Sequence, residues 1–302
     1  MTHFLRSVMF CTWLQFVECA FAFRAPSRLL FHRGSNRPYT KMLGAMAKDA
    51  WAEGINAAPA ILCDVESVPL LDPVPDGFKR LFMVRHGEVI NPGGDRAVYY
   101  GAMDVSLSPL GEVEAIEAAS YLSRFHLQHV ASSPLSRAKF GACRVLERQS
   151  PPCGERQSAV SNNDVIILEG FKELDRGSWC GLTKEEIGPD MLARFDACDE
   201  SVTPGGGGES YPALKSRVIN ARDELLRMTD AGRASAIVSH LQVTRAMLSE
   251  ALGMDVTQMA GLKIATASIS CVDYCSETGK EIVRFQSFKP ECGLMESKDG
   301  AN

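Results

Sequence analysis

The sequence lacks several patterns that mark common functional classes. Its ten cysteines include no Cys-x-x-Cys pair, which argues against a zinc ribbon or a thioredoxin-like redox motif. Lysine and arginine number 32 against 37 aspartates and glutamates, so no basic excess is available to neutralise phosphates and we expect no nucleic-acid partner. No apolar run reaches the length of a membrane-spanning helix, and we expect no membrane partner for the mature protein.

Two further absences concern phosphate binding and chain architecture. The glycine run 205–208 is not followed by Gly-Lys-Ser/Thr, so we interpret it as a flexible hinge and not as a P-loop. No internal repeat is evident. A chain of 302 residues with 45% hydrophobic content can bury its own core, which makes a disulfide framework unnecessary. We therefore expect most cysteines to be reduced and structural.

Acidic residues are also missing between Glu18 and Asp49, within a basic, serine-containing tract. Residues 1–44 are predicted to be a targeting presequence, in which 1–22 have the basic start, apolar middle and small-residue exit of a signal peptide. The stretch 20–26, together with the basic tract after it, resembles the bipartite presequence of algae with secondary red plastids. This resemblance implies import into a plastid, with the secretory pathway or the cytoplasm as alternatives.

Strands and helices alternate in the rest of the chain. We predict a linker at 45–76, a folded domain at 77–288 and a C-terminal tail at 289–302. Strands are expected near 81–84, 129–132, 164–168, 234–238, 266–274 and 281–287. Helices are expected to begin at Ser108-Pro109 and near 134–138, and to span 189–198, 209–230 and 242–252, with a short capped helix after Thr183. This order predicts a three-layer α/β/α sandwich with a mostly parallel central sheet.

Apolar spacing predicts which helix faces are buried. In the first helix we expect the inward residues to be Val113, Ile116, Ala119, Tyr121 and Leu122. In the helix over 209–230 we expect them to be Leu214, Val218, Ala221, Leu225 and Leu226.

Four strand or loop ends carry related side chains. These are Arg85-His86, Arg137, Glu173 and Ser239-His240. In an open α/β sheet ligands collect at the carboxyl ends of strands, where two arginines and two histidines would form an anion trap suited to phosphate. A histidine among arginines keeps a lone pair available for attack, and a carboxylate can supply a proton to a leaving oxygen. Taken singly, each residue is better explained as an exposed charge or a hydrogen-bonded histidine.

Together these segments resemble a known family. Arg85-His86-Gly87-Glu88 resembles the signature of the histidine phosphatase superfamily, the phosphoglycerate mutase-like clan. Five further segments match that family in order, namely Tyr100 to Gly111, Ser132 to Ala138, Glu173 to Thr183, Pro204 to Ser210 and Val238 to His240. The similarity covers roughly residues 79–287.

The resemblance implies a role for each matching residue. His86 would accept the phosphoryl group, Glu173 would act as acid and then base, and Arg85, Arg137 and His240 would hold the phosphate oxygens. Further phosphate or substrate contacts are expected from Asn91, Gly101, Ser239 and Leu241. The family needs no metal, and we expect no cofactor.

The segment after Glu173 favours the phosphatase branch. It continues directly into Gly177-Ser178-Trp179 and shows no insert with paired arginines of the mutase type. We therefore expect hydrolysis of a small phosphorylated metabolite, such as a sugar phosphate or cofactor-precursor phosphate. Phosphoglycerate mutase-type transfer and a non-catalytic binding module are the alternatives. The loops 91–105 and 176–210 are expected to line the substrate pocket, and a homodimer is the assembly that we consider.

Overall fold

The computed structural model describes residues 69–149 and 164–290. The predicted presequence, most of the predicted linker and nearly all of the C-terminal tail lie outside these residues. Among the helices in the described ranges, none combines the length and apolar character needed to cross a bilayer.

One six-stranded sheet forms the centre of the domain, in the order β3-β2-β4-β1-β5-β6. The strands are β1 (Phe78–Arg85), β2 (Leu127–Ser132), β3 (Ile166–Ile167), β4 (Ala234–Ser239), β5 (Ile269–Cys275) and β6 (Glu281–Phe288). The four strands from β3 to β1 are parallel, whereas β5 and β6 pair antiparallel. β1 and β4 lie in the middle and consist largely of apolar residues, because both of their faces are covered.

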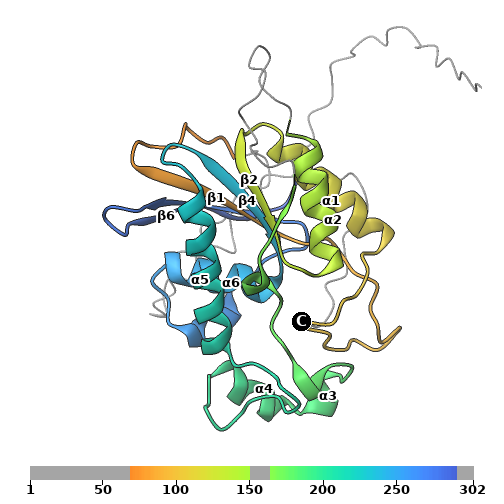
Figure 1. Cartoon of the computed structure of the whole chain (residues 1–302). Coiled ribbons are helices and arrows are strands. Elements are labelled where there is room, and N and C mark those ends of the chain that lie inside the picture. The colour runs from red at the N-terminus through yellow and green to blue at the C-terminus, as the bar shows by residue number, and fades with distance from the viewer. Residues whose placement is uncertain (1–68, 150–163, 291–302) are drawn as a thin grey trace, which may run out of the picture. The chain divides into compact units, whose positions relative to one another are not determined.

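Helices cover both faces of this sheet (Figure 1). The covering helices are α1 (Pro109–Leu122), α2 (Ser136–Glu147), α5 (Tyr211–Met228) and α6 (Leu241–Ala251). The short helices α3 (Lys184–Ile187) and α4 (Pro189–Asp196) lie away from the strands, at the bottom of Figure 1. α1 and α2 pack together on one face, and α5 and α6 pack on the other. Each face has its own hydrophobic cluster, one around Phe82 and Val84 and one around Leu81 and Met83. The predicted three-layer sandwich is confirmed.

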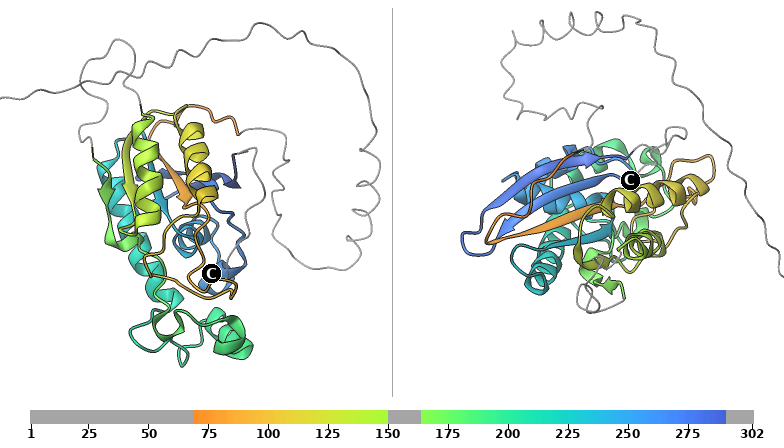
Figure 2. Two further views of the ribbon diagram at one scale, coloured as in Figure 1. Left: turned by 90° about the vertical axis from the view of Figure 1, so that its right-hand side faces the viewer. Right: turned by 90° about the horizontal axis from the view of Figure 1, so that it is seen from above.

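Several local predictions are confirmed. Ser108 caps α1 by accepting a hydrogen bond from the Gly111 amide, and Pro109 occupies its first turn. Thr183 and Glu186 form a reciprocal capping box at α3. The last two strands form an antiparallel hairpin at the sheet edge, seen in blue in Figure 2.

Other local predictions were wrong in detail. β3 has only two residues, because it pairs with β2 alone, over two positions. In α1 the buried face contains Glu114, Ala115 and Ala118, while Val113 and Ile116 are half-exposed. The cause is the close packing of α1 on α2, which favours a face of small residues over the larger apolar ones. In α5, Leu226 is half-buried beside the buried Leu225.

Residues 69–76, which the sequence assigns to the linker, contact the domain. Leu71 and Val74 pack against the cluster under α1 and α2. The carbonyl oxygen of Pro69 accepts a hydrogen bond from the Tyr121 hydroxyl at 3.1 Å. These contacts make the segment part of the domain's packed surface.

The glycine run 205–208 forms a turn against the segment that follows Glu173. The Gly205 carbonyl oxygen accepts a hydrogen bond from the Ser178 amide at 2.7 Å. Gly177 has a φ of 47° and lies so close to the Gly205 carbonyl that a Cβ at this position would overlap it. The run therefore packs on the loop 177–178 and supports it.

Candidate active site

Two neighbouring strand ends bring the two histidines together. Because β1 and β4 are parallel neighbours, Arg85 is paired with Ser239, and the residues that follow each strand meet at the same sheet edge. The His86 amide donates a hydrogen bond to the Ser239 carbonyl oxygen at 2.9 Å. The His86 and His240 rings lie edge to face, with their centroids 5.1 Å apart.

One ring nitrogen of His86 is hydrogen-bonded, and the other has no hydrogen-bond partner among the described residues. Its Nδ1 lies 2.7 Å from the Gly87 carbonyl oxygen, which can only accept, so Nδ1 carries the proton. In the neutral ring the lone pair then resides on Nε2. This atom is buried and has no hydrogen-bond partner within the described ranges. The geometry therefore presents Nε2 as a nucleophile.

The surroundings keep His86 neutral. Burial, followed by the positive charges of Arg137 and Arg85, holds the pKa of His86 well below its ordinary value of 6.5. Burial and the same arginines also lower the pKa of His240. The arginines act in the direction that the sequence predicted, while the complete burial that contributes most is a property of the fold.

Arg137 and Arg85 are held by backbone carbonyl groups. At the start of α2, Arg137 is 1% exposed and donates to the carbonyl oxygens of Gly101 at 2.8 Å and Met103 at 2.6 Å. Its Nε has no partner in the parts of the chain that the structure covers. Arg85 donates to the Ile264 carbonyl oxygen at 2.6 Å. Since carbonyl groups carry no full charge, the Arg137 guanidinium group keeps its attraction for an anion.

Glu173 is a buried carboxylate beside these cations, and only 2% of it is exposed. Its Oε1 accepts a hydrogen bond from the Leu174 amide at 2.7 Å, and its Oε2 accepts from the Gln242 amide at 3.4 Å. Arg217 of α5 fixes the backbone of this segment, donating to the carbonyl oxygens of Lys172 and Glu173. The carboxylate is therefore positioned from two separate elements.

His240 has a partner that the sequence did not predict. The Ser133 hydroxyl lies 2.7 Å from His240 Nε2, and its oxygen also accepts from the Leu135 amide at 3.3 Å. Nδ1 of His240 is buried without a partner among the residues the structure places. Gln242 was also missed. A sequence signal existed for both, since Ser133 precedes the helix of Arg137 and Gln242 follows His240 by two residues.

The remaining predicted substrate residues have mixed positions. Gly101 supports Arg137 through its carbonyl oxygen, and the Ser239 hydroxyl is buried without a partner inside the described ranges. Leu241 begins α6 directly after His240. Asn91 donates both amide hydrogens to the carbonyl oxygens of Gly94 and Arg96, within its own loop. A phosphate contact of Asn91 would require one of these bonds to open, and that role stays a prediction.

Comparison with known proteins adds independent support. Residues 81–287 match the model of the histidine phosphatase superfamily (branch 1). The chain is 31% identical over 197 residues to phosphoserine phosphatase 1 of Hydrogenobacter thermophilus, which covers 64% of this chain and 85% of that protein. It is 28% identical over 200 residues to an Escherichia coli protein described as a probable phosphoglycerate mutase, covering 65% of this chain and 85% of the relative.

A solved structure shows the same fold. Mycobacterial glucosyl-3-phosphoglycerate phosphatase superposes with a TM-score of 0.57 at 24% identity, covering 70% of this chain and 99% of that one. The chain belongs to the histidine phosphatase superfamily. It is a phosphatase of a family that forms a phosphohistidine and needs no metal. In the described residues of this histidine phosphatase, no three histidine, cysteine or acidic side chains gather as they would around a metal ion.

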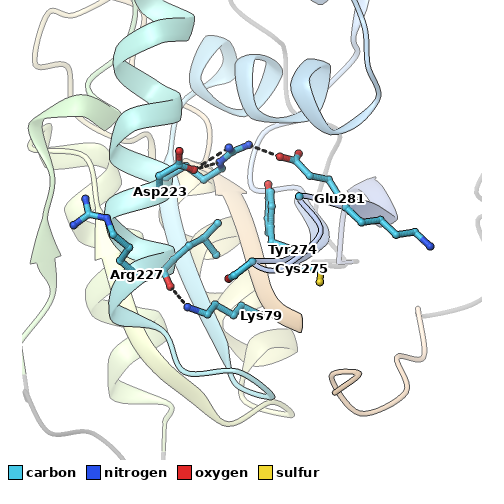
Figure 3. A pocket seen from close by; sticks show the side chains of 11 residues that line it. Lys79, Asp223, Arg227, Tyr274, Cys275 and Glu281 are labelled. Atoms are coloured by element: carbon cyan, nitrogen blue, oxygen red, sulfur yellow. Dashed lines mark hydrogen bonds and ion pairs between the residues drawn. The ribbon is translucent and has the colours of Figure 1, made fainter. Parts of the chain in front are cut away.

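A separate hollow of about 320 Å³ opens at the other end of the sheet (Figure 3). It lies between α5 and the β5–β6 hairpin, beside the start of β1. Arg222 forms ion pairs there with Asp223 and Glu281, and Lys79 donates to the Leu226 carbonyl oxygen. Oε2 of Glu281 and the Tyr274 hydroxyl group are buried there without a partner among the described residues. None of the predicted catalytic residues lines this hollow.

Gly111 gives a test of how the loop of His86 is supported. A Cβ on Gly111 would overlap the Glu88 carbonyl oxygen, so Gly111→Ala is expected to lower the free energy of unfolding by about 1–3 kcal/mol. Helix propensity alone predicts the opposite sign, a gain of about 1 kcal/mol. Denaturant titration measures the difference. Gly261→Ala, where a Cβ meets nothing within 4 Å, is the control, and equal effects at both sites would contradict the packing argument.

The pH dependence of stability follows from the two lowered pKa values. Above pH 6.5 these histidines are neutral both folded and unfolded; below it the unfolded chain binds protons that folded His86 and His240 do not. Stability is therefore lost as pH falls, by up to about 1.4 kcal/mol per pH unit for each histidine. Urea titrations between pH 7.5 and 5 should show a shallower loss for His240→Asn. The control, exposed His126→Asn, should match the wild type, and an unchanged slope in His240→Asn would refute the assignment.

Proposed function

We propose that the protein hydrolyses a small phosphomonoester through a phosphohistidine on His86. The observation that carries the proposal is the uncommitted, buried Nε2 of a neutral His86 beside two arginines. A neutral imidazole nitrogen is a nucleophile, and fixed guanidinium groups stabilise the charge on the transferring phosphoryl oxygens.

The mechanism has two phosphoryl transfers. Nε2 of His86 attacks phosphorus, and the bond to the leaving oxygen breaks as protonated Glu173 donates a proton to that oxygen. Glu173, now ionised, takes a proton from water, which attacks the phosphohistidine and releases inorganic phosphate. Arg85 and Arg137 hold the equatorial oxygens in both steps.

His240 supplies a further donor in this scheme. Ser133 Oγ accepts from the Leu135 amide and lies 2.7 Å from His240 Nε2, and we assign the Ser133 hydroxyl group as the donor to that nitrogen, which puts the ring hydrogen on Nδ1. That Nδ1–H has no acceptor among the described residues. We assign it to a phosphate oxygen, and Ser133 is then the residue that fixes the ring and its tautomer.

Substrate candidates come from the relatives. Those compared above are named for phosphoserine and glucosyl-3-phosphoglycerate as phosphatase substrates, and one is described as a mutase. Hydrolysis is favoured because the chain runs from Glu173 to the short helix of Gly177–Trp179 without a mutase-type insert. Mutase activity is the second candidate, supported by the similarity to the E. coli protein.

Phosphate release separates the two candidates. The purified protein is incubated with a panel of small phosphoesters, including phosphoserine, with and without a bisphosphate primer. A phosphatase releases inorganic phosphate at the same rate in both conditions. If instead the substrate is isomerised only when the primer is present, and no inorganic phosphate is released, the protein is a mutase.

Location and assembly are further parts of the proposal. The acid-free basic tract between Glu18 and Asp49, with the stretch 20–26 at its start, supports delivery to a plastid. Residues 1–76 fused to a fluorescent protein and expressed in an alga with secondary plastids would accumulate in the plastid, whereas secretion or cytoplasmic fluorescence would exclude plastid import.

A homodimer is the proposed assembly, and sedimentation of the full chain tests it.

A further inference from the structure

The buried side chain of Glu114, on α1, contacts the loop that carries His86. Glu114 is 2% exposed. It lies one turn after Gly111 on the buried face of α1, where the loop passes so close that a Cβ on Gly87 would overlap the Gly111 carbonyl group. From there its Oε2 accepts a hydrogen bond from the Glu88 amide at 2.8 Å. A buried carboxylate that takes no part in the proposed phosphoryl transfers is therefore bonded to the backbone of the catalytic loop.

The Glu88 amide belongs to the peptide group that also holds the His86 ring. That peptide group joins the Gly87 carbonyl to the Glu88 nitrogen, and the Gly87 carbonyl oxygen lies 2.7 Å from His86 Nδ1. The peptide bond is trans, as are all peptide bonds between described residues. In a planar trans peptide the C=O and N–H point in opposite directions. An acceptor fixed on the N–H side therefore fixes the direction of the carbonyl group.

The direction of this peptide group decides which tautomer His86 adopts. With the carbonyl oxygen toward the ring, Nδ1 must donate and the lone pair is on Nε2. If the peptide group turned over, the Glu88 N–H would face Nδ1, the ring hydrogen would move to Nε2, and Nε2 could no longer attack phosphorus. The turned peptide would also place the Gly87 carbonyl oxygen against the Glu114 carboxylate, where two acceptors repel each other.

Glu114 is itself held by two donors on its other oxygen. Its Oε1 accepts from the Thr266 hydroxyl at 3.2 Å and from Lys289 Nζ at 2.6 Å, and Lys289 directly follows the last strand, β6, in the sequence. Ala267, the residue after Thr266, donates its amide hydrogen to the His86 carbonyl oxygen at 3.1 Å. The Glu114 carboxylate therefore connects the loop of His86 to two segments near the end of the described chain.

We propose that Glu114 is a positioning residue that keeps His86 in its nucleophilic tautomer through the Gly87–Glu88 peptide group. The inference rests on the proposed phosphatase function and adds a residue that acts on His86 without touching substrate. A carboxylate suits this task, because a hydrogen bond to an ionised acceptor is about twice as strong as one between neutral groups. The ion pair with Lys289 balances the charge of the carboxylate.

A matched pair of variants isolates the acceptor at position 114. In a Lys289→Met background, Glu114→Gln and Glu114→Leu are both uncharged and similar in size, but only glutamine has an oxygen that can accept from the Glu88 amide. Replacing both members of the ion pair avoids leaving a buried charge without its partner. The tautomer is read by NMR from the ring ¹⁵N shifts of the full chain labelled at histidine. The His86 signals are those missing from the spectrum of His86→Ala.

The wild type and the glutamine form are expected to hold His86 with its hydrogen on Nδ1. The leucine form is expected to show the Nε2–H tautomer. Its kcat/KM for p-nitrophenyl phosphate should fall by about 10- to 100-fold, the size of the effect when a buried donor loses its acceptor. Inhibition by inorganic phosphate should be unchanged, because Arg85 and Arg137 bind the anion. A general distortion of the site would weaken phosphate binding as well.

Glu112→Leu in the same background is the control, because it removes an exposed carboxylate from α1 and should change neither the tautomer nor kcat/KM. If the leucine form does not fold, Glu114→Ala takes its place. A leucine or alanine form that keeps the Nδ1–H tautomer overturns the positioning role alone, whatever its rate. An Nε2–H tautomer in the wild type, or no hydrolysis of p-nitrophenyl phosphate by the wild type, overturns the proposed function as well.

Discussion

Replacing His86 with alanine is expected to reduce phosphate release by on the order of 10,000-fold or more, because the scheme has no other nucleophile. The change also removes covalent labelling. Wild-type protein mixed briefly with a ³²P-labelled phosphoester and quenched in alkali should retain label as phosphohistidine, whose N–P bond survives base and hydrolyses in acid. His86→Ala should retain none.

Two other histidine variants make this result specific. His240→Ala should still take up label, more slowly, because His240 contacts phosphate oxygens in the scheme and forms no bond to phosphorus. His126→Ala alters an exposed histidine and should label like the wild type. If label persists in His86→Ala and disappears in His240→Ala, His240 and not His86 is the residue that accepts the phosphoryl group. Phosphatase activity that survives His86→Ala would refute the mechanism.

Glu173→Gln is expected to separate substrates by their leaving groups. Glutamine cannot give a proton to an alkoxide, so hydrolysis of alkyl phosphates should fall by about 100- to 10,000-fold. p-Nitrophenolate leaves without a proton, so transfer from p-nitrophenyl phosphate to His86 should be affected much less. Because water still lacks its base in the second step, phosphohistidine should accumulate. Stopped-flow absorbance should therefore show a burst of one nitrophenolate per enzyme molecule.

The control for this burst is Glu169→Gln, an exposed acid four residues earlier in the same segment, which should match the wild type in both assays. An equal loss with aryl and alkyl substrates and no burst would show that Glu173 acts on the shape of the site and not as the proton donor. The Leu174 and Gln242 amides each donate a hydrogen bond to one oxygen of the Glu173 carboxylate. Glutamine has the same shape but keeps only one of these two bonds, because its NH2 group cannot accept a hydrogen bond.

Much of the fold was accessible to sequence patterns. The apolar runs at β1 and β4 predicted central strands, and Ser108-Pro109 and Thr183 with Glu186 predicted helix starts, because caps and buried strands depend on adjacent residues. The wrong assignments at Val113 and Ile116 have a long-range cause, since the neighbouring α2 decides which face of α1 is buried.

The features of the active site also divide into those that the sequence predicts and those that depend on the tertiary structure. The sequence by itself determined which residues stand at strand and helix ends, namely Arg85, His86, Arg137, Glu173 and His240. Their order along the chain and the α/β pattern also placed them at one edge of a sheet. Local sequence suffices here because a strand that ends in a polar residue delivers that residue to the edge in any parallel sheet.

Only the tertiary structure decided the protonation and pairing of those side chains. Nδ1 of His86 bonds to Gly87, His240 bonds to Ser133 across more than 100 residues of chain, and both rings are fully enclosed. Burial and the proximity of charges depend on every element packed around a group.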